Sequence, residues 1–169
     1  MSHRWLGLLV AATAAVAIPL HAADRPNIII LLTDDMGFSD LGCFGGEIET
    51  PNLDGLAASG LRFTEFYNTA RCWPTRATLM SGRYANRLSF DHPVIPELLK
   101  AAGYQTGMVG KWHLGRNPAK DGPRQRGFDD FYGTMIGAGS FYDPDTLARN
   151  DKFVEPEGED YYYTDVKGR

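Results

Sequence analysis

The sequence predicts an α/β fold with a mainly parallel central sheet flanked by helices. Residues 27–32, Asn-Ile-Ile-Ile-Leu-Leu, form a nearly continuous apolar run, which is typical of a strand buried on both faces of a parallel sheet. Helix and strand patterns then alternate along the chain, and this alternation favours an α/β arrangement. Polar residues that follow the first strand would lie at its carboxyl end, where open α/β sheets bind ligands.

Two helices are predicted from the residues that begin and end them. Thr50 is expected as the N-cap of the first, with a proline in its first turn and Gly60 at its end. The second covers residues 95–102, with Pro96 in its first turn and Gly103 as its stop. Both helices are therefore bounded by local signals.

Two further strands are predicted between and after these helices. Residues 61–67 alternate apolar and polar side chains, as a half-buried strand does, and residues 104–109 return as a strand. Residues 133–169 are rich in Gly, Asp, Pro and Tyr, which indicates long surface loops.

The amino-terminal residues have the pattern of a secretory signal. His3 and Arg4 give a short basic start, residues 6–20 are apolar and rich in Ala, and Ala22 offers a small residue at the expected cleavage site. We expect residues 1–22 to be a signal peptide and the protein to be periplasmic or extracellular, with no stable membrane span. A buried core helix or a retained anchor is the alternative. The net charge of −4 argues against a nucleic-acid partner.

Residues 72–76, Cys-Trp-Pro-Thr-Arg, are the first group with chemical potential. Pro74 predicts a helix that starts nearby, because proline has no N–H to leave unpaired in a first turn. Cys72 would then lie at the positive end of the helix, where free N–H groups favour an anion. Arg76 lies one turn on, on the same side. The alternative is a buried cysteine and a surface arginine.

Asp34 and Asp35 form the second group. They follow the run at residues 27–32 directly, so a strand there would place both carboxylates at the ligand-binding edge. Carboxylate oxygens are preferred ligands of Ca²⁺ and Mg²⁺. The alternative is a solvated turn or a helix N-cap.

Lys111 and His113 form the third group, within the segment Gly-Lys-Trp-His-Leu-Gly at residues 110–115. In an extended segment their side chains point to the same side. Lysine supplies positive charge to an oxyanion, and histidine can exchange a proton near neutral pH. The alternative is a surface lysine and a packed histidine.

In their order and spacing, the three groups resemble the type I sulfatases. The matching segments are residues 25–37 with the Asp-Asp pair, residues 72–83 with the Cys-x-Pro-Thr-Arg motif, and residues 110–115. The resemblance extends over about residues 25–163 and implies an alkaline-phosphatase-like fold and hydrolysis of sulfate esters. A sulfated small molecule or glycan is the implied substrate.

The resemblance also implies the cofactors. Cys72 would be converted to formylglycine by a formylglycine-generating or equivalent maturation enzyme, and the hydrated aldehyde would be the nucleophile. Asp34 and Asp35, with the modified Cys72, would contact a Ca²⁺ ion, Mg²⁺ being possible. Because export makes a disulfide between the two cysteines the default, that disulfide is the alternative; we favour an unpaired Cys43.

The remaining roles follow from the same resemblance. Arg76 would hold the formylglycine, Lys111 would contact a sulfate oxygen, and His113 would orient or deprotonate the hydroxyl. The family is longer than this chain and completes its site with a distal Asp-Asn pair, a second His and a second Lys. We therefore expect residues 23–169 to be the amino-terminal portion of a sulfatase catalytic domain, with an incomplete sheet. A phosphatase or phosphonate hydrolase of the same superfamily, or an inactive exported fragment, are the alternatives.

Overall fold

The computed structural model describes residues 25–87, 92–158 and 161–163. Contacts between residues divide the chain into a unit that ends at Leu32 and a unit that begins at Thr33. The signal peptide expected at residues 1–22 lies outside the described residues. None of the described helices is long and apolar enough to cross a membrane.

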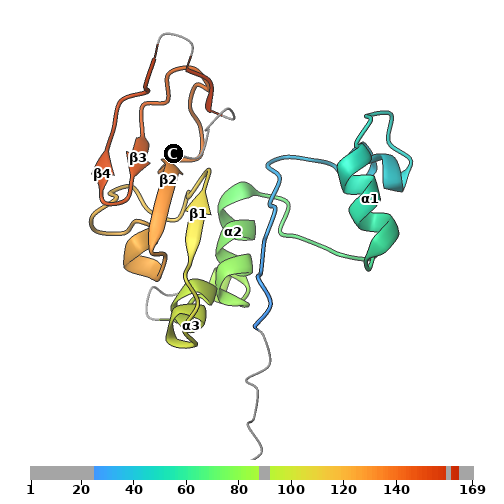
Figure 1. Cartoon of the computed structure of the whole chain (residues 1–169), viewed down its shortest axis with the longest axis horizontal. Coiled ribbons are helices and arrows are strands. Elements are labelled where there is room, and N and C mark those ends of the chain that lie inside the picture. The colour runs from blue at the N-terminus through green and yellow to red at the C-terminus, as the bar shows by residue number, and fades with distance from the viewer. Residues whose placement is uncertain (1–24, 88–91, 159–160, 164–169) are drawn as a thin grey trace, which may run out of the picture. The chain divides into compact units, whose positions relative to one another are not determined.

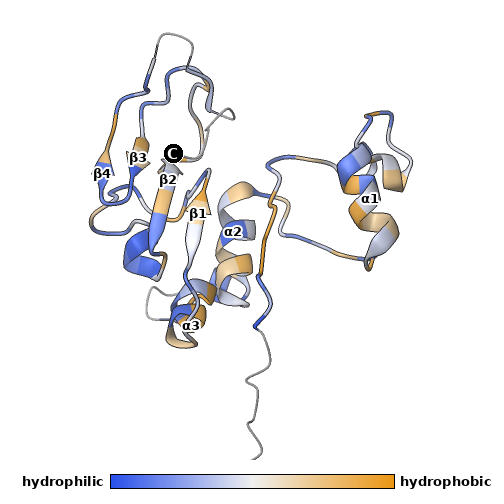
Figure 2. Ribbon diagram, in the orientation of Figure 1, coloured by the Kyte–Doolittle hydropathy of each residue, from blue (hydrophilic) through white to orange (hydrophobic). Residues whose placement is uncertain are grey.

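The first unit is described only at residues 25–32, and no strand forms there. The expected buried strand is therefore wrong for this structure. Ile29 is 82 % exposed and Leu31 is 71 % exposed, and Figure 2 shows how apolar this unpaired segment is. A strand is held by hydrogen bonds to a neighbour, and no described strand pairs with these residues.

The second unit contains a sheet of four described strands in the order β1-β2-β3-β4 (Figure 1). The strands are β1 (Gly107–Val109), β2 (Asp130–Thr134), β3 (Leu147–Arg149) and β4 (Lys152–Phe153). β1 pairs with β2 in parallel, with Met108 opposite Phe131. β2 pairs with β3, and β3 with β4, in antiparallel register. The described part of the sheet is thus mixed, with one parallel pair.

The hairpin of β3 and β4 corrects the expectation of long loops over residues 133–169. Arg149 lies opposite Lys152, so the turn has two residues, and the first, Asn150, has a positive φ of 56°. Asparagine adopts this conformation more readily than most residues. Its side-chain Oδ1 accepts a hydrogen bond from the Phe131 N–H at 2.9 Å, which ties the turn to β2.

Helices α2 (Cys72–Ser81) and α3 (Ile95–Ala101) contact each other beside the sheet (Figure 1). The expected helix at residues 95–102 is confirmed, with Ala102 as its C-cap. The strand expected at residues 104–109 forms only at its last three residues. Short 3₁₀ helices lie at η3 (Ala85–Arg87) and η4 (Pro123–Arg126).

The core of this unit lies between the sheet, the β1–β2 connection and α2. Trp112, Phe131, Met135 and Ala148 are buried together, and Met80 of α2 packs against them. The Trp112 and Phe128 rings meet edge to face at 6.3 Å between centroids, a favourable aromatic geometry. Packing of Met80 therefore fixes the face of α2 that also carries Arg76, one turn earlier.

A separate group of elements precedes α2: η1 (Phe38–Asp40), η2 (Gly42–Phe44) and α1 (Pro51–Ser59). The helix expected between Thr50 and Gly60 is confirmed, and these residues are its N-cap and C-cap. The Thr50 hydroxyl does not cap the helix. It accepts a hydrogen bond from the Gly42 N–H at 3.0 Å and donates one to Asp54 at 2.9 Å.

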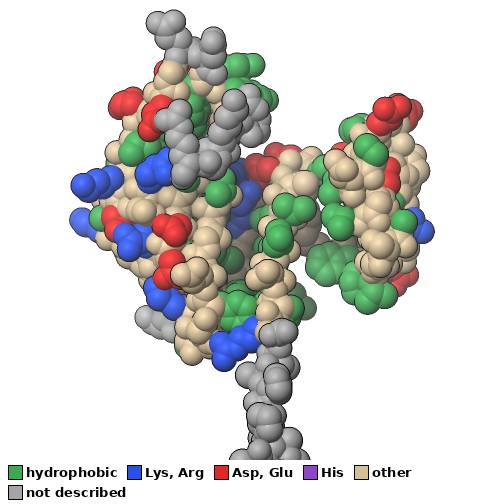
Figure 3. Space-filling model, in the orientation of Figure 1, with side chains coloured by type: hydrophobic (Ala, Val, Ile, Leu, Met, Phe, Trp, Pro, Cys, Tyr) green, Lys and Arg blue, Asp and Glu red, His purple; other side chains and the backbone are tan. Residues whose placement is uncertain are grey.

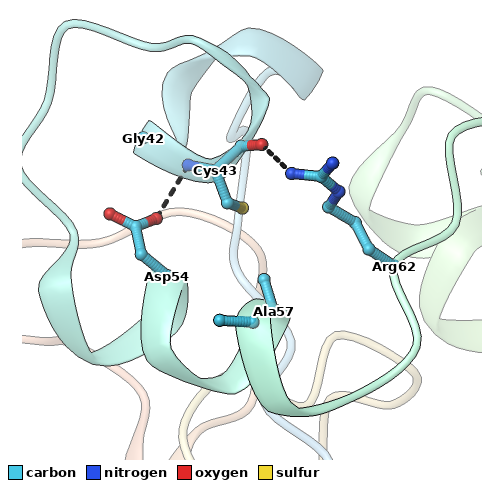
Figure 4. Close-up of a pocket in the computed structure, with 6 residues that line it drawn as sticks. Gly42, Cys43, Asp54, Ala57 and Arg62 are labelled. Carbon is cyan, nitrogen blue, oxygen red and sulfur yellow. Dashed lines mark hydrogen bonds between the residues drawn. The ribbon is translucent and has the colours of Figure 1, made fainter.

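Residues 61–67 form no strand, so that expectation is also wrong. Leu61 is 89 % exposed and Phe66 is 77 % exposed, and Figure 3 shows hydrophobic side chains on the surface of the part that carries α1. Arg62 from this segment donates a hydrogen bond to the Cys43 carbonyl, and both residues line a pocket (Figure 4). The alternating pattern alone therefore does not make a strand where no neighbour pairs with it.

Candidate functional site

Two cations converge on one carboxylate in the second unit. Lys111 Nζ donates a hydrogen bond to Asp34 Oδ2 at 2.6 Å, and Arg76 Nη2 donates one to Asp34 Oδ1 at 3.2 Å. These residues come from the start of the unit, from α2 and from the β1–β2 connection. We call Asp34, Arg76 and Lys111 the charge cluster.

Arg76 is the most buried member of the charge cluster. It is 9 % exposed, and its Nη1 donates a hydrogen bond to the Lys111 carbonyl oxygen at 2.6 Å. Its Nε is buried and has no hydrogen-bond partner. A buried donor without a partner is costly, so this N–H lowers the net stability that the guanidinium contributes.

Lys111 is aimed by the backbone that continues from β1. The N–H of Trp112 donates to the Thr134 carbonyl at 2.9 Å, and the N–H of His113 donates to the Met135 carbonyl at 3.1 Å. These bonds extend the pairing with β2 past the end of β1. The Trp112 side chain is in the core, so Lys111, its neighbour, points away from the core and reaches Asp34.

His113 lies in the electrostatic field of the charge cluster. Partial burial lowers the pKa of His113 below its usual value, and the positive charges of Lys111 and Arg76 lower it further. A neutral imidazole can accept a proton. Its Nδ1 is buried without a partner, and its ring lies against Gly137, where a Cβ would be 2.2 Å from the ring.

Lys111 and Arg76 stabilise the ionised form of the Asp34 carboxylate. Partial burial raises the pKa of Asp34, but hydrogen bonds from Lys111 and Arg76 outweigh it and lower the pKa below its usual value. The carboxylate is thus ionised near neutral pH and matches the two cations.

Cys72 and Asp35 are not joined to the charge cluster by a hydrogen bond or ion pair in the described structure. Cys72 is the first residue of α2, two residues before the expected start near Pro74, and it lies one helical turn before Arg76. It is half-buried and its thiol is free, as is that of Cys43, so the alternative disulfide does not form. Asp35 is exposed, with a positive φ of 57°.

The described residues offer ligand atoms of the right type for a divalent cation, but too few of them to hold one. Asp34 and Asp35 offer the hard oxygens that Ca²⁺ and Mg²⁺ prefer. No group of three or more His, Cys, Asp or Glu side chains in the described ranges is arranged to hold a metal ion. Both Asp34 oxygens are also engaged by the charge cluster, so further ligands would be needed.

The structure adds a residue that the sequence did not single out. The Tyr163 hydroxyl accepts a hydrogen bond from the Thr134 N–H at 3.2 Å. Burial raises the pKa of Tyr163, while the nearby charge of Arg76 acts in the opposite direction. A tyrosine within a run of three tyrosines carries no distinguishing local signal, and only the fold brings it near Arg76.

Comparison with known proteins gives a consistent result. The family model for sulfatases matches residues 26–166. The chain is 40 % identical over 133 residues to arylsulfatase J of Mus musculus, covering 70 % of this chain and 22 % of that protein. It is 43 % identical over 150 residues to arylsulfatase A of Homo sapiens, covering 77 % and 28 %.

A solved structure is similar as well. The crystal structure of Ps i-CgsB superposes with a TM-score of 0.73 at 34 % identity, covering 84 % of this chain and 39 % of that one. Ps i-CgsB has also been solved in complex with k-i-k-neocarrahexaose. The chain spans only about a quarter of the length of the two arylsulfatases, 22 % and 28 %.

Proposed function

Because this chain belongs to the sulfatase family, we propose that it forms the amino-terminal part of an enzyme that hydrolyses sulfate esters. Residues 1–22 would be the signal peptide and residues 23–169 the amino-terminal portion of the catalytic domain. The protein would then be exported, to the periplasm or the extracellular space. The mass of the mature protein tests this, since cleavage after Ala22 leaves residues 23–169.

The observation that carries the proposal is the convergence of Arg76 and Lys111 on one anion. The side chains of Arg76 and Lys111 are only 10 % and 13 % exposed. Because burial strengthens interactions between charges, the two cations form a site for a negatively charged oxygen. Asp34 occupies this position in the structure. The sulfate group of an ester offers several oxygens of the same kind.

Each residue then has a role in the reaction. Lys111 would bind a sulfate oxygen, while Arg76 would hold the formylglycine and, beside Lys111, stabilise the negative charge that develops on the sulfate group. His113, neutral near pH 7, would orient the formylglycine hydroxyl or take its proton at an imidazole nitrogen. Formylglycine formed from Cys72 would supply the hydroxyl nucleophile, and a divalent cation held by Asp34 and Asp35 would supply Lewis acidity.

The relatives indicate the chemical class of the substrate. Two relatives carry the name arylsulfatase, and a similar structure holds an oligosaccharide. We therefore propose a sulfated small molecule or glycan. The maturation enzyme that converts Cys72 would be a further partner.

The decisive assay compares hydrolysis of a sulfate ester with that of a phosphate ester, and the effect of substituting Cys72 with that of substituting Cys43. The chain extended through the downstream reading frame is co-expressed with a formylglycine-generating enzyme and tested on 4-nitrophenyl sulfate and 4-nitrophenyl phosphate. We expect sulfate to be hydrolysed faster, Cys72→Ala to abolish turnover, and the matched control Cys43→Ala to retain it. Faster phosphate turnover would favour a phosphatase or phosphonate hydrolase instead, and activity in Cys72→Ala would rule out the proposed nucleophile.

Residues 1–169 by themselves should show little or no sulfatase turnover, even with Cys72 converted. Two carboxylates supply only part of the six to eight oxygen ligands that Ca²⁺ prefers, so the ion would be weakly held. Displacement of a reacting group by about 1 Å can cost on the order of 100-fold in rate. The assay is therefore run beside a chain extended through the downstream reading frame. Equal turnover by both would show that the short chain already holds a complete site.

A further inference from the structure

The loop that follows Lys111 and His113 is closed by a single acidic residue. Asp121 Oδ1 accepts hydrogen bonds from two consecutive backbone donors, the Arg116 N–H at 2.9 Å and the Asn117 N–H at 2.6 Å. A carboxylate that accepts from backbone N–H groups makes a strong, charge-assisted hydrogen bond. This side chain therefore fixes the turn that begins at Arg116.

The backbone of the same residue holds the core tryptophan. Trp112 Nε1 donates a hydrogen bond to the Asp121 carbonyl oxygen at 2.9 Å. Trp112 is 2 % exposed, so its indole N–H has little access to water and depends on this partner. Trp112 stands between Lys111 and His113 in the chain, and its anchoring limits how both can move.

Close packing adds a third restraint at Gly115. A Cβ at Gly115 would lie 2.1 Å from the Asp121 carbonyl oxygen, which is far inside contact distance. The backbone at residue 115 thus lies directly against Asp121. Side chain, backbone and packing all hold the loop of residues 115–121 against the segment that carries Lys111.

We propose that Asp121 is a positioning residue that fixes Lys111 and His113 for anion binding through Trp112 and the loop of residues 115–121. It contacts no member of the charge cluster among the interactions described, and it acts through the backbone. The inference rests on the proposed function, because it assigns Asp121 to the site that would bind the sulfate group.

The test uses two substitutions that differ in one property. Asp121→Ala removes the acceptor for the Arg116 and Asn117 N–H groups, whereas Asp121→Asn keeps an acceptor oxygen and loses only the charge. Asp145→Ala is the matched control, since Asp145 is exposed and no hydrogen bond or ion pair of its side chain is described. All variants are studied in the whole 169-residue chain, well below their melting temperatures.

The first readout is hydrogen exchange at the Trp112 and His113 amides, which donate to the carbonyls of Thr134 and Met135. We expect Asp121→Ala to speed exchange there by about 10-fold, the effect of losing a hydrogen bond to a charged group. Asp121→Asn should restore most of the protection, and Asp145→Ala should leave it unchanged. Unchanged exchange in Asp121→Ala overturns the proposal, whatever happens to stability.

The second readout is binding of inorganic sulfate, followed by NMR titration. We expect Asp121→Ala to weaken the affinity about 10-fold and Asp121→Asn to recover most of it. If exchange rises while sulfate affinity stays the same, Asp121 is merely structural and the proposal is overturned. If the unaltered chain binds no sulfate while exchange still rises in Asp121→Ala, the proposed anion site fails, yet Asp121 still fixes the segment that carries Lys111 and His113.

Discussion

Replacement of Arg76 by alanine should weaken anion binding more than it weakens the fold. Arg76 makes one hydrogen bond to the Lys111 carbonyl and one to Asp34. Hydrogen bonds to charged groups contribute roughly 1.5–3 kcal/mol each. The Asp34 carboxylate is 42 % exposed, so solvent screening reduces its share to below about 1 kcal/mol.

The burial of the guanidinium reduces the net loss further. Its Nε has no partner, and an unpaired buried donor costs about 1–3 kcal/mol, which the substitution relieves. We therefore expect Arg76→Ala to lower the free energy of unfolding by only about 1–2 kcal/mol. Sulfate would lose one of two cations, and at an effective dielectric near 20 this contact is worth up to about 4 kcal/mol. Screening brings the expected loss to roughly 10- to 100-fold in affinity.

Urea denaturation measures the first quantity, and calorimetric titration with sulfate measures the second. Arg124→Ala is the control, because Arg124 forms an exposed ion pair with Asp151 and should affect neither by more than about 1 kcal/mol. The reasoning is refuted if Arg76→Ala binds sulfate as tightly as the unaltered chain. If Arg76→Ala lowers the free energy of unfolding by more than it lowers the free energy of sulfate binding, the main role of Arg76 is to stabilise the fold.

Three further outcomes are expected. Peptide mass spectrometry after co-expression with a formylglycine-generating enzyme should show loss of the thiol mass at Cys72 and an intact thiol at Cys43; a modified Cys43 would contradict the assignment. The Lys100 hydrogen bond lowers the pKa of Asp129 to about 2, below its unfolded value of 3.8, so the stability it contributes is complete above pH 3.8 and disappears as the pH falls towards 2. Acid titration followed by circular dichroism should show a flatter curve in Asp129→Asn, and an unchanged curve would exclude this source. Trp112→Ala should lower the free energy of unfolding by about 3–5 kcal/mol, and a loss below 1 kcal/mol in urea would show that the core does not depend on this ring.

The helices were the predictable part of the fold, because their signals are local. Thr50 and Gly60 bound α1 as expected, and Pro96 lies in the first turn of α3. A helix satisfies its own backbone hydrogen bonds, so its ends can be identified from neighbouring residues. The start of α2 was displaced by two residues from the position that Pro74 suggested.

The strands were less predictable, because each depends on a partner elsewhere in the chain. The apolar run at residues 27–32 has the composition of a buried strand but no described neighbour. Conversely, β3 and β4 lie in a region with weak strand signals, and a two-residue turn at Asn150 brings them together. Composition alone does not decide pairing.

The candidate site also has a part that the sequence predicts and a part that it does not. The residue types at positions 34, 76 and 111 suggested charge chemistry before any fold was known, and the structure places the Arg76 and Lys111 side chains within hydrogen-bond distance of the Asp34 carboxylate. The bond from Arg76 to the Lys111 carbonyl and the loop closed by Asp121 involve backbone atoms. Contacts to backbone atoms cannot be predicted from the order of side chains in the sequence.

The separation of the charge cluster along the chain affects how it can form during folding. Arg76 and the Lys111 carbonyl are 35 residues apart, whereas Lys111 and Asp34 are 77 residues apart. Closing the longer loop from an open chain costs about 0.7 kcal/mol more in entropy. Contacts between distant residues tend to be slow to form. The two cations can therefore meet before the carboxylate that neutralises them arrives, and high salt, which screens their repulsion, should favour that earlier contact.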